Sequence, residues 1–270
     1  MTSTPRTKAD DVHQRQLSRD GITLHYRVCG AGPSVVLIPS LGRGTEDFDP
    51  LLPPLLQAGL RLILPEPRGI GGSSPLRDGE TLHQMAADVA AIIAAEAAGP
   101  AVLVGHAAGN WVARVLAHDR PDLTRAVALV AAIVTNVVPE GVKTSISASF
   151  DMALPDEERL GHLRAVYFAA ASDASVWLDG WWPEVSAAQR EAARLTRDQD
   201  WIRVADRFET LYVGAAEDVI SPPPDLDVLR DKIGPKADCV VIPGAGHALL
   251  PEQPEAVAQA LADWVGGLPG

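Results

Sequence analysis

The chain has 270 residues, 47% of them hydrophobic and 21% charged, a balance that excludes global disorder and fits one large domain or two small ones. Its net charge of −12, without a basic stripe, argues against nucleic acid and anionic membranes as partners. The start, MTSTPRTKADDVHQRQ, has no apolar core, no stretch is apolar for the roughly 18 residues of a membrane span, and the two cysteines form no CxxC pair. We therefore expect a cytoplasmic protein without a membrane segment.

Short apolar runs alternate along the chain with alanine- and leucine-rich runs at helical spacing. The first pair, QLSRDGITLHYRV, predicts a β-hairpin that turns at Asp20 and Gly21. Further strands are predicted at 34–39, 61–66, 101–105, 125–131, 209–214 and 237–243, and helices around 46–58, 81–97, 110–120, 224–232 and 254–265. Continuously apolar strands need cover on both faces, which favours an open, mostly parallel sheet with crossover helices.

The alternation is interrupted at residues 137–206, which contain four of the six tryptophans. We interpret this stretch as a helical cap over the carboxyl ends of the strands, where ligands bind in such sheets. A structural insert whose tryptophans only pack is the alternative. The expected organisation is a flexible segment 1–14, an α/β core of 15–136 and 207–270, and the cap.

The most informative motif is AVLVGHAAGNW, in which two glycines frame Ala107 after a buried strand. The centre of such a strand-to-helix turn normally carries a nucleophile, and the turn needs small neighbours because its central residue is strained. Alanine has no reactive atom. The next residue, Ala108, offers its backbone N–H at a helix N-terminus, a favourable place for an oxyanion. His106 is expected to pack within the turn.

Two further loops follow predicted strands and carry titratable side chains. Asp218 lies in VGAAEDVISPP, and His247 lies in VIPGAGHALLPEQP after the last strand. With Ala107 they stand in the order nucleophile position, acid, histidine, which is the chain order of hydrolases with this type of turn. Each loop alone is weak evidence, but the three together at strand ends predict one catalytic constellation.

The chain resembles the α/β-hydrolase superfamily over residues 15–266, through the segments LIPSLGRG, PEPRGIGGSS, VGHAAGN, GAAEDVISPP and PGAGHALLPEQPEAVAQAL. The resemblance implies an α/β-hydrolase fold with a helical cap. It implies that Asp218 orients His247 as general base and acid, and that the backbone N–H groups of Leu41 and Ala108 form an oxyanion hole. Capped members hydrolyse esters, lactones, carbon–carbon bonds, epoxides or carbon–halogen bonds.

The sequence departs from this pattern at two places. Ala107 replaces the usual Ser, Asp or Cys, which removes the nucleophile on which covalent catalysis depends. In LIPSLG, Pro39 and Ser40 replace the common His-Gly of the oxyanion loop, and Ser40 adds a hydroxyl close to where His247 is expected to point. Arg43, in the same loop, is expected to be solvated.

Three functional interpretations follow. The first is a hydrolase of a small, partly apolar ester or lactone, with Ala107 marking a natural or engineered loss of the nucleophile. The second is a cofactor-free acid/base enzyme, a lyase, oxygenase or water-activating hydrolase, which uses His247 and Asp218 and in which Ser40 contributes a hydroxyl. The third is a non-catalytic binder of small molecules.

All three interpretations share one expected pocket. It is mostly apolar and holds a small-molecule substrate, with Trp181 and Trp182 as the expected cap contacts. The histidines show no metal-ligand spacing, so neither a metal nor a cofactor is expected. The sequence leaves the substrate and the oligomeric state open.

Overall fold

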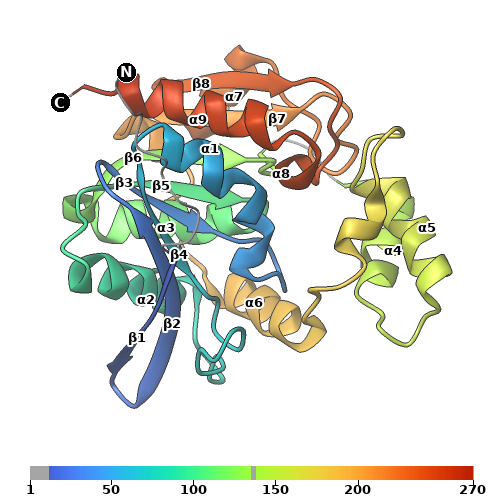
Figure 1. The fold of residues 1–270 in the computed structure, drawn as a ribbon, viewed down its shortest axis with the longest axis horizontal. Helices are drawn as coiled ribbons and strands as arrows, with labels where there is room; N and C mark the ends of the chain where they lie inside the picture. The colour runs from blue at the N-terminus through green and yellow to red at the C-terminus, as the bar shows by residue number, and fades with distance from the viewer. Residues whose placement is uncertain (1–11, 135–137, 270) are drawn as a thin grey trace, which may run out of the picture.

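The computed structural model describes residues 12–134 and 138–269, and the strands in this part form one eight-stranded sheet in the order β1-β2-β4-β3-β5-β6-β7-β8 (Figure 1). The strands are β1 (His13–Arg19), β2 (Ile22–Gly30), β3 (Ser34–Ile38), β4 (Arg61–Pro65), β5 (Ala101–His106), β6 (Thr124–Val130), β7 (Thr210–Ala215) and β8 (Ala237–Ile242). Strand β2 runs antiparallel to its neighbours β1 and β4, and the pairs from β4 to β8 are parallel. The predicted mostly parallel sheet is therefore confirmed.

The amino-terminal hairpin forms where the sequence predicts it. Asp20 and Gly21 join β1 to β2 and have φ angles of 48° and 74°. A two-residue turn with positive φ at both positions matches the twist of the flanking strands, and glycine adopts such angles without strain. Strand β1 begins at His13, within the segment 1–14 that was expected to be flexible, and residues 1–11 of that segment lie outside the described part.

The helices also follow the predicted order. They are α1 (Leu52–Gln57), α2 (Leu82–Ala95), α3 (Gly109–Asp119), α4 (Glu140–Ser149), α5 (Asp156–Val166), α6 (Pro183–Leu195), α7 (Leu226–Ile233), α8 (Leu249–Glu252) and α9 (Pro254–Gly267). The single helix expected at 46–58 is instead a 3₁₀ helix, Thr45–Leu51, followed by α1. Pro50 lies inside the 3₁₀ helix, and a proline there cannot donate the backbone hydrogen bond that an α-helix needs.

Side chains alternate between the two faces of the sheet, and helices cover both. In β3, Val36 and Ile38 join a buried cluster with α2 and α3, whereas Val35 and Leu37 join a second cluster with α1 and α9. Figure 1 shows these helix pairs on opposite sides of the strands. This two-sided burial explains why the central strands read as continuous apolar runs.

Residues 138–206, which we call the insert, connect β6 to β7 and contain α4, α5 and α6. In Figure 1, α4 and α5 stand away from the sheet, while α6 lies closer to the core. The insert has its own apolar cluster, which includes Tyr167, Trp177 and Trp181, and this cluster also takes in Ile220 and Ala248 from core loops. The first residue of the expected cap, 137, lies outside the described residues. Within residues 12–134 and 138–269, no helix is both long and apolar enough to span a bilayer.

Candidate active site

The strand-to-helix turn after β5 is built around an alanine. Ala107 has a φ of 44°, a left-handed conformation that costs a non-glycine residue about 1–3 kcal/mol. Its backbone N–H donates to the carbonyl of Val130 at 2.7 Å, which holds the turn against β6. Ala108 follows as the N-cap of α3. The backbone of a nucleophile turn is therefore present, with a methyl group where the reactive atom would be.

The two framing glycines are required by close backbone contacts. A Cβ atom at Gly105 would lie 2.5 Å from the backbone nitrogen of Asn110, and one at Gly109 would lie 2.3 Å from the carbonyl oxygen of Ile38. Both contacts are far shorter than van der Waals distance and involve backbone atoms that cannot rotate away. The turn therefore needs glycine at both positions because backbone atoms occupy the space of a side chain.

Gly109→Ala is expected to lower the free energy of unfolding by about 1–3 kcal/mol or more, because the added methyl group forces β3 and α3 apart. Urea denaturation measures the change. Gly161→Ala is the matched control, since a Cβ at Gly161, inside α5, meets nothing within 4 Å and alanine is the better helix former. Equal stability of Gly109→Ala and the unmodified protein would show that the turn tolerates the methyl group.

His247 and Asp218 meet at the carboxyl ends of β8 and β7. His247 Nδ1 and Asp218 Oδ2 are 2.8 Å apart, and both side chains are buried. The other carboxylate oxygen accepts the backbone N–H groups of Ile220 and Ser221, each at 2.8 Å. A carboxylate can only accept, so Nδ1 carries the proton and Nε2 is left as the basic nitrogen. This arrangement is that of an oriented general base.

The loop that carries His247 is fastened to the insert. The backbone N–H of Ala248 donates to the carbonyl of Tyr167 at 2.7 Å. The Glu252 carboxylate accepts the N–H of Gly246 at 2.8 Å with one oxygen and that of Ala169 at 2.7 Å with the other. Glu252 therefore positions the histidine loop, a role that the sequence analysis did not predict because both of its partners are backbone groups.

A cavity of about 510 Å³ lies between the core and the insert. Its core side is lined, among others, by Ser40, Leu41, Ala107, Ala108 and His247. From the insert come, among others, Ile146, Phe150, Tyr167 and Arg190. The structure thus brings together the predicted nucleophile position, the histidine, both predicted oxyanion donors and Ser40, with Asp218 directly behind His247.

The two tryptophans expected in the substrate pocket lie elsewhere. Trp181 is buried behind the lining, with its ring 4.6 Å from that of Phe150 and 5.5 Å from that of Tyr167, and its Nε1–H donates to the carbonyl of Trp177. Trp182 is 39% exposed and is not among the lining residues. Phe150 and Tyr167 occupy the positions that the tryptophans were expected to fill. The sequence does not show which aromatic side chains of the insert face the core.

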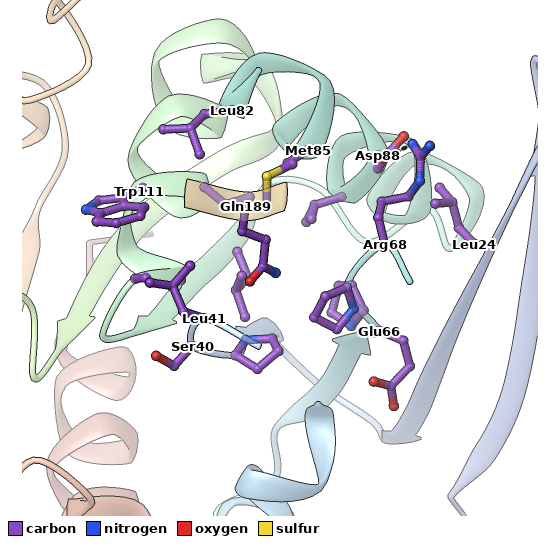
Figure 2. Close-up of a pocket in the computed structure, with 18 of the residues that line it drawn as sticks. Leu24, Ser40, Leu41, Glu66, Arg68, Leu82, Met85, Asp88, Trp111 and Gln189 are labelled. Atoms are coloured by element: carbon purple, nitrogen blue, oxygen red, sulfur yellow. Dashed lines mark hydrogen bonds and ion pairs between the residues drawn. The ribbon is translucent and has the colours of Figure 1, made fainter. Parts of the chain in front are cut away.

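A second, smaller cavity of about 50 Å³ lies on the other side of the oxyanion loop. Met85 of α2 and Gln189 of α6 lie across it from Ser40 and Leu41 (Figure 2). The Ser40 hydroxyl points away from this cavity in Figure 2, and Ser40 also lines the larger pocket. The loop therefore forms the wall between the two spaces.

Arg43 is buried, so the expectation of a solvated side chain was wrong. Its guanidinium lies 4.7 Å from the ring centres of Trp177 and Trp181, and its Nη1–H donates to the carbonyl of Asp179 at 2.8 Å. Asp47 supplies the neutralising charge, with its Oδ2 3.0 Å from Arg43 Nε. Carboxylate pairing and indole contacts compensate the charge for its lost hydration.

The same loop is held by two further contacts from the insert. The backbone N–H of Gly42 donates to Gln189 Oε1 at 2.8 Å, and its carbonyl accepts the N–H of Trp182 at 2.9 Å. Together with Arg43, these bonds fix the backbone that carries Leu41. Trp182 was expected to line the pocket, but it instead holds the oxyanion loop through its backbone N–H.

His106 packs within the turn, in line with the expectation. It is fully buried, its Nε2–H donates to the carbonyl of His247 at 3.3 Å, and its Nδ1 has no partner among the described residues. Burial, reinforced by the neighbouring His247, lowers the pKa of His106 to about 3. The ring is therefore neutral at physiological pH.

This buried histidine makes acid destabilising. Because the folded-state pKa of about 3 lies below the ordinary 6.5, only the unfolded chain binds the proton between these values. The contribution of the neutral His106 ring to the free energy of unfolding is fully present above about pH 6.5. It is lost as the pH falls below that value, by at most about 1.4 kcal/mol per pH unit. Urea denaturation from pH 7.5 to 5 measures this slope, and His106→Gln is expected to flatten it. An unchanged slope in the variant would contradict the assignment.

The fold and the site together define a class, the α/β-hydrolases. The chain matches the pattern described as "Alpha/beta hydrolase family" over residues 35–260, and it belongs to that family. It is an α/β-hydrolase-fold enzyme, similar in sequence to proteins named as haloperoxidases and a carbamate hydrolase and similar in fold to an esterase. Among the described residues, no group of three or more His, Cys, Asp or Glu side chains is arranged to hold a metal ion.

Three relatives illustrate the range. "Putative carbamate hydrolase RutD" of Variovorax paradoxus (strain S110) is 40% identical over 110 residues, a match that covers 40% of this chain and 41% of that protein. "Putative non-heme bromoperoxidase BpoC" of Mycobacterium tuberculosis H37Rv is 27% identical over 263 residues, covering 89% and 96% of the two chains. Its crystal structure aligns with a TM-score of 0.76, covering 92% of this chain and 97% of that one. An esterase from Thermogutta terrifontis, 22% identical, shares the fold with a TM-score of 0.73, covering 95% and 99%.

Proposed function

We propose that the protein hydrolyses a small, partly apolar ester or lactone, and that water attacks the carbonyl directly. One observation carries this proposal: the buried Asp218–His247 pair faces a pocket in which position 107 holds only a methyl group. The base is oriented and the space is present, but the side chain that would form an acyl-enzyme is absent. The insert acts as the cap over this pocket.

The reaction then consumes one water molecule in a single addition–elimination sequence. His247 Nε2 takes a proton from water while the water oxygen bonds to the carbonyl carbon, and the carbonyl electron pair moves onto its oxygen. The backbone N–H groups of Leu41 and Ala108 stabilise that oxyanion. When the carbonyl re-forms, the carbon–oxygen bond to the alcohol breaks, and the departing alkoxide takes the proton from His247. Asp218 stays ionised and stabilises the imidazolium.

The lining and the relatives support this substrate class. Side chains such as Leu41, Ile146 and Phe150 give the cavity apolar walls, while Ser40 places a hydroxyl beside the oxyanion loop. Apolar walls favour a substrate with hydrocarbon around one polar carbonyl group. A relative named as a carbamate hydrolase and structural neighbours that include esterases agree with carbonyl chemistry.

A second candidate is proton abstraction from a carbon acid by the same base, and Tyr167 favours it. Its ring lies 5.8 Å from that of His247, and its hydroxyl forms no hydrogen bond with the described residues. Burial raises the pKa of Tyr167 above its usual value, so the phenol stays protonated and can donate to an enolate oxygen. Such an enzyme would need no nucleophile at position 107.

A panel of chromogenic esters and lactones, assayed beside simple ketones in deuterated water, separates the candidates. The proposed hydrolase releases the alcohol and forms one acid per turnover. A carbon-acid enzyme would instead exchange the α-hydrogens of the ketones for deuterium and leave the esters intact. Tight binding of panel members without either reaction would identify a non-catalytic binder.

A further inference from the structure

Arg190 is a cation of the pocket with open hydrogen-bond donors. It lies on α6 and lines the larger cavity. Its Nε–H donates to Ser186 Oγ at 3.3 Å, and its guanidinium carbon lies 5.4 Å from the ring centre of Phe150. Within the described residues Arg190 forms no ion pair, and its one side-chain hydrogen bond is the one from Nε, so its two terminal nitrogens have no protein partner there. Arg190 is exposed to solvent at the edge of the cavity, so the guanidinium is held at its Nε edge while its terminal N–H groups face solvent and the cavity.

Neighbouring arginines show how this differs from a satisfied side chain. Arg194, four residues further along α6, forms two bonds to the Glu191 carboxylate at 2.6 and 2.7 Å. Arg43, across the loop, is saturated by Asp47 and by a backbone carbonyl. Arg190 differs from both because its terminal nitrogens have no protein partner among the described residues and are available to a ligand in the cavity.

The other charges of the lining leave this positive charge uncompensated. Lys143 and Glu140 also line the cavity, but they pair with each other at 3.2 Å. His247 is engaged with Asp218. Arg190 is therefore the cation of the lining without a carboxylate partner among the described residues, in a protein whose net charge is −12. Its charge extends to Tyr167, where it opposes the effect of burial on the pKa of the phenol.

We infer that Arg190 is the binding site for a carboxylate group of the substrate, which makes the substrate an ester or lactone that also carries a free acid. This inference rests on the proposed hydrolase function, since it describes the same pocket. The planar guanidinium presents two parallel N–H donors that match a carboxylate, and its carbon lies over the Phe150 ring. One cation balances one carboxylate, whereas a phosphate dianion carries a second negative charge.

The test compares p-nitrophenyl hemiglutarate, an ester with a free carboxylate, with its neutral methyl ester. The unmodified protein is expected to prefer the acid by about 10- to 100-fold in kcat/KM, mainly through KM, as for loss of a charged hydrogen bond. Arg190→Gln is expected to remove this preference, so that the acid and the neutral ester react with similar kcat/KM. Arg194→Gln, on the same helix, is expected to keep it.

The outcomes distinguish this inference from the function on which it rests. An unchanged preference in Arg190→Gln, or no preference in the unmodified protein, would overturn the carboxylate site while the hydrolase stands. If no ester is hydrolysed, the hydrolase proposal fails, and calorimetric titration with glutarate monomethyl ester tests the site by itself. Binding that Arg190→Gln weakens at least tenfold would support the site, and equal binding or no binding would overturn it.

Discussion

Replacing His247 by alanine is expected to lower kcat/KM for ester hydrolysis by about 10²- to 10⁴-fold, the usual contribution of a positioned general base. His247 lines the cavity, and its Nδ1 is engaged by Asp218 at 2.8 Å, so Nε2 is the nitrogen available to activate water. Without it, only the oxyanion donors and the apolar pocket remain. Initial rates on the best chromogenic ester give the ratio.

Two further variants make this result specific. Asp218→Asn keeps the size of the side chain but places an amide against Nδ1, and its rate is expected to fall by a comparable factor because the tautomer is no longer fixed. His118→Ala, on the exposed side of α3, is expected to leave the rate unchanged. Retention of the full rate by His247→Ala would show that the reaction does not use this base.

Ala107→Ser is expected to raise the rate on activated esters by about a thousandfold or more. The backbone of the turn already holds position 107 at a φ of 44°, and the side chain already lies in the wall of the pocket beside His247. Removing the nucleophile of a complete triad costs about 10⁶-fold in kcat, so a hydroxyl placed on an intact dyad is expected to recover a part of that factor. The same ester panel measures the gain.

The double variant Ala107→Ser with His247→Ala provides the decisive control. If the gain comes from a serine activated by His247, it disappears in the double variant. Ala107→Gly changes the turn without adding an oxygen and is expected to show no gain. A serine variant no faster than the unmodified protein would mean that Nε2 and position 107 are not aligned for proton transfer.

The site residues that follow buried strands could be predicted from sequence, and those that depend on the insert could not. Ala107 directly follows β5, and Asp218 and His247 follow β7 and β8 by short loops, so the ends of parallel strands bring them to one edge of the sheet. The pocket face of the insert depends on how α4, α5 and α6 pack. For that reason Phe150 and Tyr167, rather than Trp181 and Trp182, line the cavity.

Arg43 shows a second reason for failure. A charged residue in a glycine-rich loop is usually solvated, and its burial requires partners that lie far away in the chain, such as Trp177 and Trp181. One local signal was present, because Asp47 lies four residues after Arg43 and forms the ion pair. The helix expected at 46–58 is a simpler case, since Pro50 in the sequence already argues against one continuous α-helix there.

The central claim is that water activated by His247 attacks the carbonyl directly, without an acyl-enzyme. Intact mass spectrometry of the protein, quenched in acid during turnover of an activated ester, tests this claim. The unmodified protein is expected to show its own mass throughout while the acid product accumulates, and Ala107→Ser to show an added acyl group. An acyl group on the unmodified protein during turnover would contradict the claim. Peptide mapping would then locate a different nucleophile, with Ser40 of the oxyanion loop as the first residue to examine.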